Sequence, residues 1–332
     1  MKLLFIFTGG TIGSTKEQGV ISAKESKAYA ILSAYERKYG IDFEYEVAEP
    51  YTEVSENNTG VHIKKLCDCV KDACRKDYDG IIVTHGSDTL QYSAAAIGYC
   101  IGLCTPPVCL VAANAPIEDK CSNALDNLRG AVRFVEERAG QGAFAVYRNA
   151  SGDRVRVHRA TRLIGSAAYT DELMSVKNCV FGEFDGNFNF IGNPDYYELP
   201  DGTEPFDCRL LNESNEEALV LFSYPAMTYP RIGENVKYVI FNTYHSGTLN
   251  TVSDAALRFF ASARERGIPV FATGAEKGLC YSSSAEFDRL GIIPLYNISP
   301  VAAYIKLWLA HSWGRELKTA VNIPLSGDLP TN

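Results

Sequence analysis

The feature that most constrains this fold is an apolar run that breaks directly into a glycine-containing, hydroxyl-rich turn. Leu3 to Phe7 are all apolar, and residues 8–14 then read TGGTIGS. The run has the length and composition of a strand buried on both faces, as in a parallel sheet. Adjacent glycines let the backbone turn sharply, so the hydroxyls stand at the carboxyl end of the strand. In open α/β sheets, this is the edge at which ligands bind.

A second stretch repeats this pattern about 75 residues later. Residues 80–83 read GIIV, and residues 84–89 continue as THGSDT, which adds the carboxylate of Asp88 to the hydroxyls. We expect this run to be another buried strand. Two such turns at adjacent strand ends would form a single polar pocket.

Apolar runs and helical patterns alternate over much of the remaining chain. Strands are predicted at residues 43–47, 107–113, 143–147, 218–222, 236–241 and 269–272. Helices are predicted at residues 28–39, 61–75, 93–102, 125–137, 253–265 and 300–311. Strands alternating with helices predict an α/β fold with a mostly parallel sheet flanked by helices. Residues 16–22 are polar and are predicted to form a mobile loop over the pocket.

The alternation is interrupted once, which suggests two domains. Residues 182–215 are rich in Gly, Asn, Asp, Glu and Pro, as is common in linkers. We predict a larger N-terminal α/β domain over residues 1–190, a linker over 191–215 and a smaller C-terminal α/β domain over 216–332.

Composition narrows the functional classes. A net charge of −8 and a pI near 5.3 argue against binding to nucleic acids or to anionic membranes, which both require a basic surface. Neither an export signal nor an apolar run near the roughly 20 residues of a membrane span is recognisable, so a cytoplasmic location is predicted. The ten cysteines show no paired CxxC and no histidine at zinc-finger spacing. They are expected to be mostly buried thiols, and no metal is implied.

The two turns carry residues suited to attack on a small carbonyl group. A Thr hydroxyl is a weak nucleophile until a proton path activates it, and Ser87 can relay a proton. Asp88 can hold a cation or a substrate ammonium group. Gly10 and Gly86 leave backbone N–H groups free to face a developing oxyanion. Taken alone, such turns are equally compatible with phosphate binding or with simple helix capping.

The two motifs at this separation resemble those of the bacterial-type L-asparaginase family. The resemblance implies hydrolysis of the side-chain amide of asparagine, and in some members glutamine, through a Thr acyl-enzyme without metal or organic cofactor. It also implies assembly into homodimers or homotetramers. Thr11 matches the nucleophile of the family, and Ser87 matches its second catalytic Thr. Asp88 matches the acidic residue that holds the α-amino group of the substrate and the catalytic Lys. Ser55 and Glu56 match the substrate-binding positions for the α-carboxylate and α-amino groups.

Three positions depart from the family pattern. The mobile loop has Val20 where a catalytic Tyr is expected, and Tyr29 is a candidate replacement only if the loop folds differently. The segment 154–162, in which the catalytic Lys is expected, contains no Lys, and the alignment places Arg159 there. A guanidinium can orient Asp88 and stabilise charge, but it cannot act as a general base. Members of the family also contribute an acidic or amide residue of the C-terminal domain to the active site across the dimer. Near this position the chain offers the hydroxyl-rich segment 281–284 and Glu286.

Three functional hypotheses therefore stay open. The first is an asparaginase-type amidohydrolase, and the second is a weak or inactive amino-acid-binding protein on the same scaffold. The third is the amidase subunit of a tRNA-dependent amidotransferase. The acidic charge and a first strand that begins at residue 2 are expected to disfavour this third hypothesis.

Overall fold

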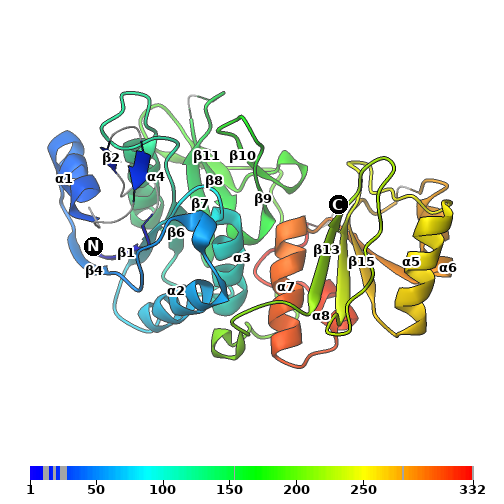
Figure 1. The fold of residues 1–332 in the computed structure, drawn as a ribbon. Coiled ribbons are helices and arrows are strands. Elements are labelled where there is room, and N and C mark those ends of the chain that lie inside the picture. The colour runs from blue at the N-terminus through cyan, green and yellow to red at the C-terminus, as the bar shows by residue number, and fades with distance from the viewer. Residues whose placement is uncertain (10–14, 18–19, 23–27, 153, 279, 331–332) are drawn as a thin grey trace.

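The described residues contain two main β-sheets, each flanked by helices, and two small two-stranded sheets (Figure 1). The computed structural model describes residues 1–9, 15–17, 20–22, 28–152, 154–278 and 280–330. Gly10 and Thr11 lie outside these ranges. The side chains of residues 10–29, which include Val20 and Tyr29, are also outside the description.

The larger sheet has eight strands in the order β12-β11-β8-β7-β6-β5-β1-β4. Strands β4, β1, β5, β6 and β7 are parallel, whereas β8 runs antiparallel to β7. This confirms the predicted fold class. The strands are β1 (Lys2–Phe7), β4 (Glu44–Ala48), β5 (Gly80–Thr84), β6 (Val108–Val111), β7 (Ala143–Arg148), β8 (Val155–Arg159), β11 (Gly182–Phe184) and β12 (Phe190–Gly192).

Strand β1 shows why the first apolar run is uninterrupted. Its side chains alternate between two cores, because successive residues of a strand point to opposite faces. Leu4 and Ile6 pack with helices α2 (Gly60–Ala73) and α3 (Leu90–Ile101). Leu3, Phe5 and Phe7 pack on the other face with α1 (Ala28–Tyr39) and α4 (Ala124–Glu136). Helices thus cover both faces of the sheet at β1, as the uninterrupted apolar run predicts.

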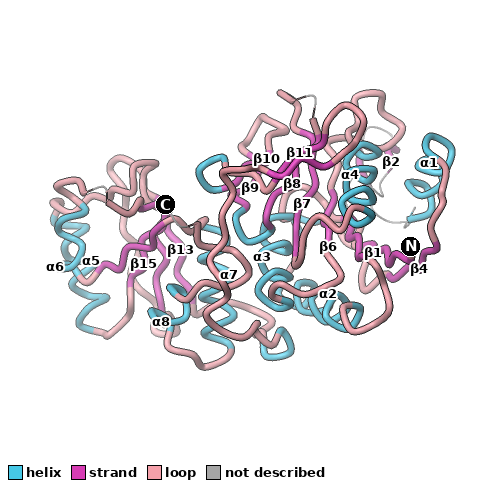
Figure 2. Tube along the Cα trace, turned by 180° about the vertical axis from the view of Figure 1, so that it is seen from behind, coloured by secondary structure: helices cyan, strands magenta, loops and turns pink. Residues whose placement is uncertain are grey.

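The second sheet has four parallel strands in the order β13-β14-β15-β16. They are β13 (Ala218–Phe222), β14 (Tyr238–Asn242), β15 (Val270–Ala275) and β16 (Ile292–Tyr296). Helices α5 (Asp254–Glu265) and α6 (Phe287–Leu290) cover one face. Helix α7 (Pro300–Ser312) lies between this sheet and α3 and joins the two halves in one core, with α8 (Leu317–Asn322) beside it (Figures 1 and 2).

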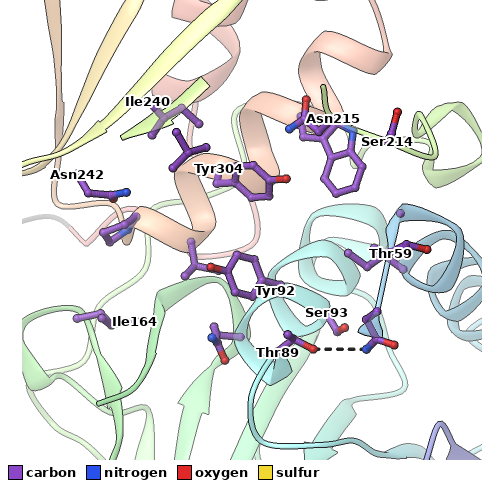
Figure 3. Close-up of a pocket in the computed structure, with 18 of the residues that line it drawn as sticks. Thr59, Thr89, Tyr92, Ser93, Ile164, Ser214, Asn215, Ile240, Asn242 and Tyr304 are labelled. Carbon is purple, nitrogen blue, oxygen red and sulfur yellow. Dashed lines mark hydrogen bonds between the residues drawn. The ribbon is translucent and has the colours of Figure 1, made fainter. Parts of the chain in front are cut away.

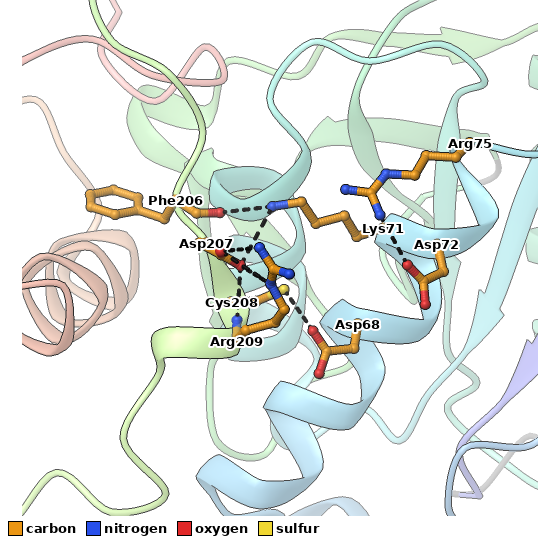
Figure 4. Close-up of polar contacts among 8 residues, drawn as sticks. All are labelled: Asp68, Lys71, Asp72, Arg75, Phe206, Asp207, Cys208 and Arg209. Carbon is orange, nitrogen blue, oxygen red and sulfur yellow. Dashed lines mark hydrogen bonds and ion pairs between the residues drawn. The ribbon is translucent and has the colours of Figure 1, made fainter.

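The polypeptide between the sheets docks along α2 (Figure 4). The Lys71 ammonium donates to the Phe206 carbonyl at 3.5 Å and lies 3.9 Å from the Asp207 carboxylate. The Cys208 thiol donates to the Asp68 carboxylate at 3.1 Å. This segment is therefore fixed to the larger half by several polar contacts, and the proposed domain limits at 190 and 215 stay a prediction.

Several elements were not expected from the sequence. Residues 16–22 are predicted as a loop, but two short strands pair antiparallel there, β2 (Thr15–Glu17) and β3 (Val20–Ser22). Residues 160–192 add β9 (Leu163–Ser166) and β10 (Leu173–Ser175), and residues 292–296 form β16. All are short, so their periodicity is weak.

The ten cysteines are all free thiols, four buried, four half-buried and two exposed. Over the described residues, no helix has the length and hydropathy needed to cross a membrane.

Candidate active site

The two predicted turns begin side by side at the carboxyl edge of the larger sheet. Strands β1 and β5 are direct neighbours, with Phe7 opposite Thr84 in the register. Immediately beyond β1, the buried Thr8 hydroxyl donates to the Thr84 carbonyl oxygen at 2.8 Å. The turn that leads to Thr11 therefore starts beside the turn that carries Ser87 and Asp88.

A third segment, residues 51–59, closes against the first turn. The Glu53 amide donates to the Thr8 carbonyl oxygen at 3.0 Å. Gly9 has φ +94°, and a Cβ there would overlap the Glu53 backbone, so only glycine allows this approach. The contact brings Ser55 and Glu56 to the same edge of the sheet. Ser55 is buried, and Glu56 is exposed.

His85 is a packed, neutral member of the second turn. Its side chain is fully buried, and this burial lowers the pKa of His85 to about 4. Its Nδ1 lies 2.8 Å from the Gly86 carbonyl oxygen, and its Nε2 lies 3.3 Å from Asn58 Nδ2. A neutral ring that donates from Nδ1 and accepts at Nε2 satisfies both contacts. His85 therefore helps to fix Asn58.

Three polar residues that the sequence analysis did not single out tie the site together. The Thr89 hydroxyl donates to the Ser55 carbonyl oxygen at 2.8 Å, and Asn58 Nδ2 donates to Thr89 Oγ1 at 3.4 Å. The Gln91 amide donates to the Asp88 carbonyl oxygen at 3.1 Å. Thr89 belongs to the motif quoted above, but neither Asn58 nor Gln91 carried a sequence signal. Together they hold the loop that carries Ser55 against the turn that carries Asp88.

Ser87 and Asp88 precede Thr89, which is the residue before the first turn of α3. Gly86 is buried, Ser87 is half-buried and Asp88 is exposed. The amino end of a helix has a positive partial charge, which favours a bound carboxylate. The exposed carboxylates of Asp88 and Glu56 favour an ammonium group. An edge that offers both is suited to a zwitterionic amino acid.

Arg159 does not lie at this edge. Strand β8 is antiparallel to β7, so Arg159 is paired with Phe144 near the amino end of β7, the opposite end of the sheet. Its buried guanidinium pairs with Glu198 at 2.6 Å and donates to the Gln141 carbonyl oxygen at 2.7 Å. It also stacks on the Phe144 ring, with Cζ 4.1 Å from the centroid. These contacts give Arg159 a structural role and keep it away from Asp88.

Strand β9 passes the first turn of α3 and presents a glycine there. Gly165 has φ +110°, and a Cβ on it would lie 3.1 Å from the side-chain amide carbon of Gln91. Gln91 in turn holds the Asp88 carbonyl. Gly165 therefore packs against the side chain that holds the Asp88 backbone.

The hydroxyl-rich C-terminal segment makes mainly local contacts. Ser284 Oγ exchanges hydrogen bonds with the Tyr281 backbone at 2.8 and 3.0 Å. Glu286 pairs with Arg289 on the adjoining helix at 2.5 Å. Contacts across a dimer are outside a single chain, so a contribution from Glu286 to a neighbouring site stays a prediction.

Comparison with known proteins is consistent with this geometry. Solved structures with the same fold include the thermostable L-asparaginase from Thermococcus kodakarensis, with a TM-score of 0.81 and 21% identity over 100% of both chains. L-asparaginase I from Vibrio cholerae gives a TM-score of 0.76 and 20% identity over 99% of both chains.

Sequence relatives include two archaeal proteins, each described as a subunit of glutamyl-tRNA(Gln) amidotransferase. The Thermococcus kodakarensis protein is 24% identical over 319 residues, covering 90% of this chain and 69% of the relative. The Pyrobaculum aerophilum protein is 26% identical over 330 residues, covering 95% and 76%. The family model "Asparaginase, N-terminal" matches residues 2–193, more than half of the 332 residues. The chain therefore belongs to the asparaginase family.

Proposed function

We propose that this protein hydrolyses the side-chain amide of L-asparagine, with L-glutamine as the alternative substrate, to the acid and ammonia. The observation that carries the proposal is the pair of hydrogen bonds made by Thr8, to the Thr84 carbonyl and from the Glu53 amide. They bring to one edge of the sheet the three segments that carry the nucleophile, acid and substrate-binding positions of the family.

The proposed reaction has two steps. The Thr11 hydroxyl attacks the amide carbon, its proton passes through Ser87 to the leaving nitrogen, and the C–N bond breaks to release ammonia. Water then attacks the resulting ester, releases the acid and restores the hydroxyl. The backbone N–H groups of Gly10 and Gly86 stabilise the oxyanion.

Substrate binding is assigned to the neighbouring loop and turn. Asp88 and Glu56 hold the α-ammonium group, and Ser55 binds the α-carboxylate. The two exposed carboxylates favour a substrate amino group over an acidic ligand. Arg159 has no part in this scheme, because its guanidinium is bound at the opposite end of the sheet.

The test is ammonia release from each amide by the purified protein and by Thr11→Ala, with the exposed Thr170→Ala as matched control. We expect turnover in the wild type and in Thr170→Ala, and a loss of at least about 10³-fold in Thr11→Ala. Turnover that survives Thr11→Ala would contradict the Thr mechanism. Binding of aspartate with no turnover of either amide would favour the amino-acid-binding hypothesis.

The names of the sequence relatives favour a second candidate, a component of a tRNA-dependent amidotransferase. Such a component would release ammonia from glutamine chiefly in the presence of a partner and a charged tRNA. Unassisted turnover of asparagine would exclude this role as the main activity. Homo-oligomerisation and a cytoplasmic location stay predictions, to be tested by light scattering and by cell fractionation.

A further inference from the structure

Two cysteine thiols touch at the amino edge of the larger sheet. Cys74 is the residue that ends α2, before β5, and Cys104 lies between α3 and β6. The Cys74 Sγ atom lies 3.4 Å from the Cys104 Sγ atom. Both residues are half-buried, so a small solute in the surrounding water can reach the pair. The two sulfurs therefore form an accessible dithiol.

The backbone holds both cysteines in place. The Cys74 amide donates to the Val70 carbonyl oxygen at 2.9 Å, and the Cys104 carbonyl oxygen accepts from the Gly142 amide at 2.8 Å. The sulfur–sulfur distance in a disulfide is about 2.05 Å, so the two Sγ atoms need to approach by about 1.4 Å. Rotation about the Cα–Cβ bonds can supply this approach while the backbone hydrogen bonds are retained.

The two thiols differ in reactivity. The hydrogen bond from the Cys74 thiol lowers the pKa of Cys104, whereas the same bond, together with burial, raises the pKa of Cys74. Because the thiolate is the reactive form of cysteine, Cys104 is the nucleophile of the pair. Cys109 provides a contrast, since its side chain is 0% exposed and burial raises the pKa of its thiol.

We propose that Cys74 and Cys104 form a reversible redox site, at which a peroxide oxidises the two thiols to a disulfide. The Cys104 thiolate attacks one peroxide oxygen, the O–O bond breaks, and a sulfenic acid and hydroxide form. The hydroxide takes the Cys74 proton and becomes water. The Cys74 thiolate then attacks the sulfenic sulfur, the S–O bond breaks, and the second hydroxide takes a proton from solvent. The two sulfurs thus give two electrons, and a dithiol reverses the step by exchange.

The disulfide would restrain the segment that carries part of the candidate active site without entering that site. It would close a covalent loop over residues 74–104, which contains β5, the turn with Ser87 and Asp88, and α3. The bond lies at the amino edge of the sheet, whereas the turn lies at the carboxyl edge. Neither cysteine lines the cleft of about 910 Å³ between the two halves (Figure 3). The inference does not rest on the proposed function, because it concerns the thiols alone.

The experiment treats the reduced full chain with a small excess of hydrogen peroxide. Free thiols are blocked with N-ethylmaleimide, and peptides are mapped by mass spectrometry without reduction. We expect the main product to link Cys74 to Cys104, dithiothreitol to restore both thiols, and Cys109 to stay reduced. The exposed thiols of Cys121 and Cys280 serve as the internal reference for access of the oxidant.

Two variants test the assigned roles, with the exposed Cys121→Ser as matched control. In Cys74→Ser the sulfenic acid has no partner, so dimedone should label Cys104 at least about tenfold more than in the wild type. In Cys104→Ser, Cys74 should stay almost unlabelled. Peroxide should raise Tm by about 5 °C in the wild type and in Cys121→Ser, because the closed loop lowers the entropy of the unfolded chain, and in neither of the other variants.

Three results would each overturn the proposal. The first is oxidation of Cys121 or Cys280 while Cys74 and Cys104 stay free. The second is a main disulfide between other partners. The third is a Tm of the wild type that peroxide does not raise. The peptide map of the wild type decides the first two even if a variant fails to fold.

Discussion

Replacing either member of the Lys306–Asp328 ion pair should strongly destabilise the protein. Both side chains are 0% exposed, and Lys306 Nζ lies 2.6 Å from Asp328 Oδ2. Nζ also donates to the Ile323 carbonyl oxygen at 2.5 Å. The Asp328 carboxylate accepts from the Tyr99 hydroxyl at 2.9 Å and from the Leu325 amide at 3.0 Å. The pair thus joins α7 and the C-terminal segment to α3 of the other half.

Each single substitution should lower the free energy of unfolding, because it leaves one buried charge without its partner. Asp328→Asn retains the volume but leaves the Lys306 ammonium uncompensated, which costs about 3–5 kcal/mol. For a chain of this length, the unfolding entropy is about 0.7 kcal/mol/K, so a loss of about 4 kcal/mol lowers Tm by about 6 °C. Lys306→Met should cost a similar amount. The double variant should lose about 2–3 kcal/mol less than the sum of the two single losses.

Urea unfolding followed by circular dichroism and by Trp fluorescence measures these differences, and coincident curves would support a single transition. The matched control is Asp72→Asn, which breaks an exposed i,i+3 pair with Arg75 and should cost less than about 0.5 kcal/mol. A loss below about 1 kcal/mol in either single buried variant would refute the reasoning. So would additive losses in the double variant.

Three further predictions concern the turn, the buried histidines and a helix cap. Gly9→Ala should lower the free energy of unfolding by about 1–3 kcal/mol, because φ is +94° and a Cβ would overlap Glu53; an unchanged Tm would contradict this. Burial lowers the pKa of His85 to about 4 and that of His158 to about 3. As the pH falls, the unfolded chain binds these two protons at a higher pH than the folded chain does. The stabilisation that the neutral histidines give the folded state is therefore complete well above about pH 6.5, and it is lost as the pH falls from there to about 3. Each His should cost about 2 kcal/mol between about pH 7 and pH 5. Urea titrations should show this loss, and in His158→Gln it should fall by about half. Ser299→Ala should lower the free energy of unfolding by about 1–2 kcal/mol, because the Ser299 hydroxyl accepts a hydrogen bond from the Ala302 amide at 2.9 Å at the start of α7. Thermal unfolding measures this loss, and an unchanged Tm would show that the cap does not stabilise the protein.

The parts of the fold predicted well from the sequence are those set by local periodicity. Five consecutive apolar residues before Thr8 require cover on both faces of a strand, and β1 has it. The central parallel strands and the main helices follow from the same argument. The neighbouring starts of the two turns, at Thr8 and at Thr84, also followed, since parallel neighbours end at the same edge of a sheet.

The position of Arg159 could not be predicted in this way. Local sequence identified neither β8 nor its direction, and the direction determines which end of the sheet Arg159 occupies. Because β8 is antiparallel, its last residue returns to the amino end of β7 and meets Glu198, 39 residues away in sequence. Asn58 and Gln91 were missed for a related reason, since their importance lies in partners that only the folded chain brings near.

The buried ion pair also fixes the contact between the central helices of the two halves. Helix α7 carries Lys306, and α3 carries Tyr99. The Tyr99 hydroxyl and the Lys306 ammonium meet on the same carboxylate oxygen of Asp328, so one buried acceptor holds both helices. Removal of this acceptor should therefore weaken the packing of α7 on α3 as well as the ion pair itself, because both depend on the same atom.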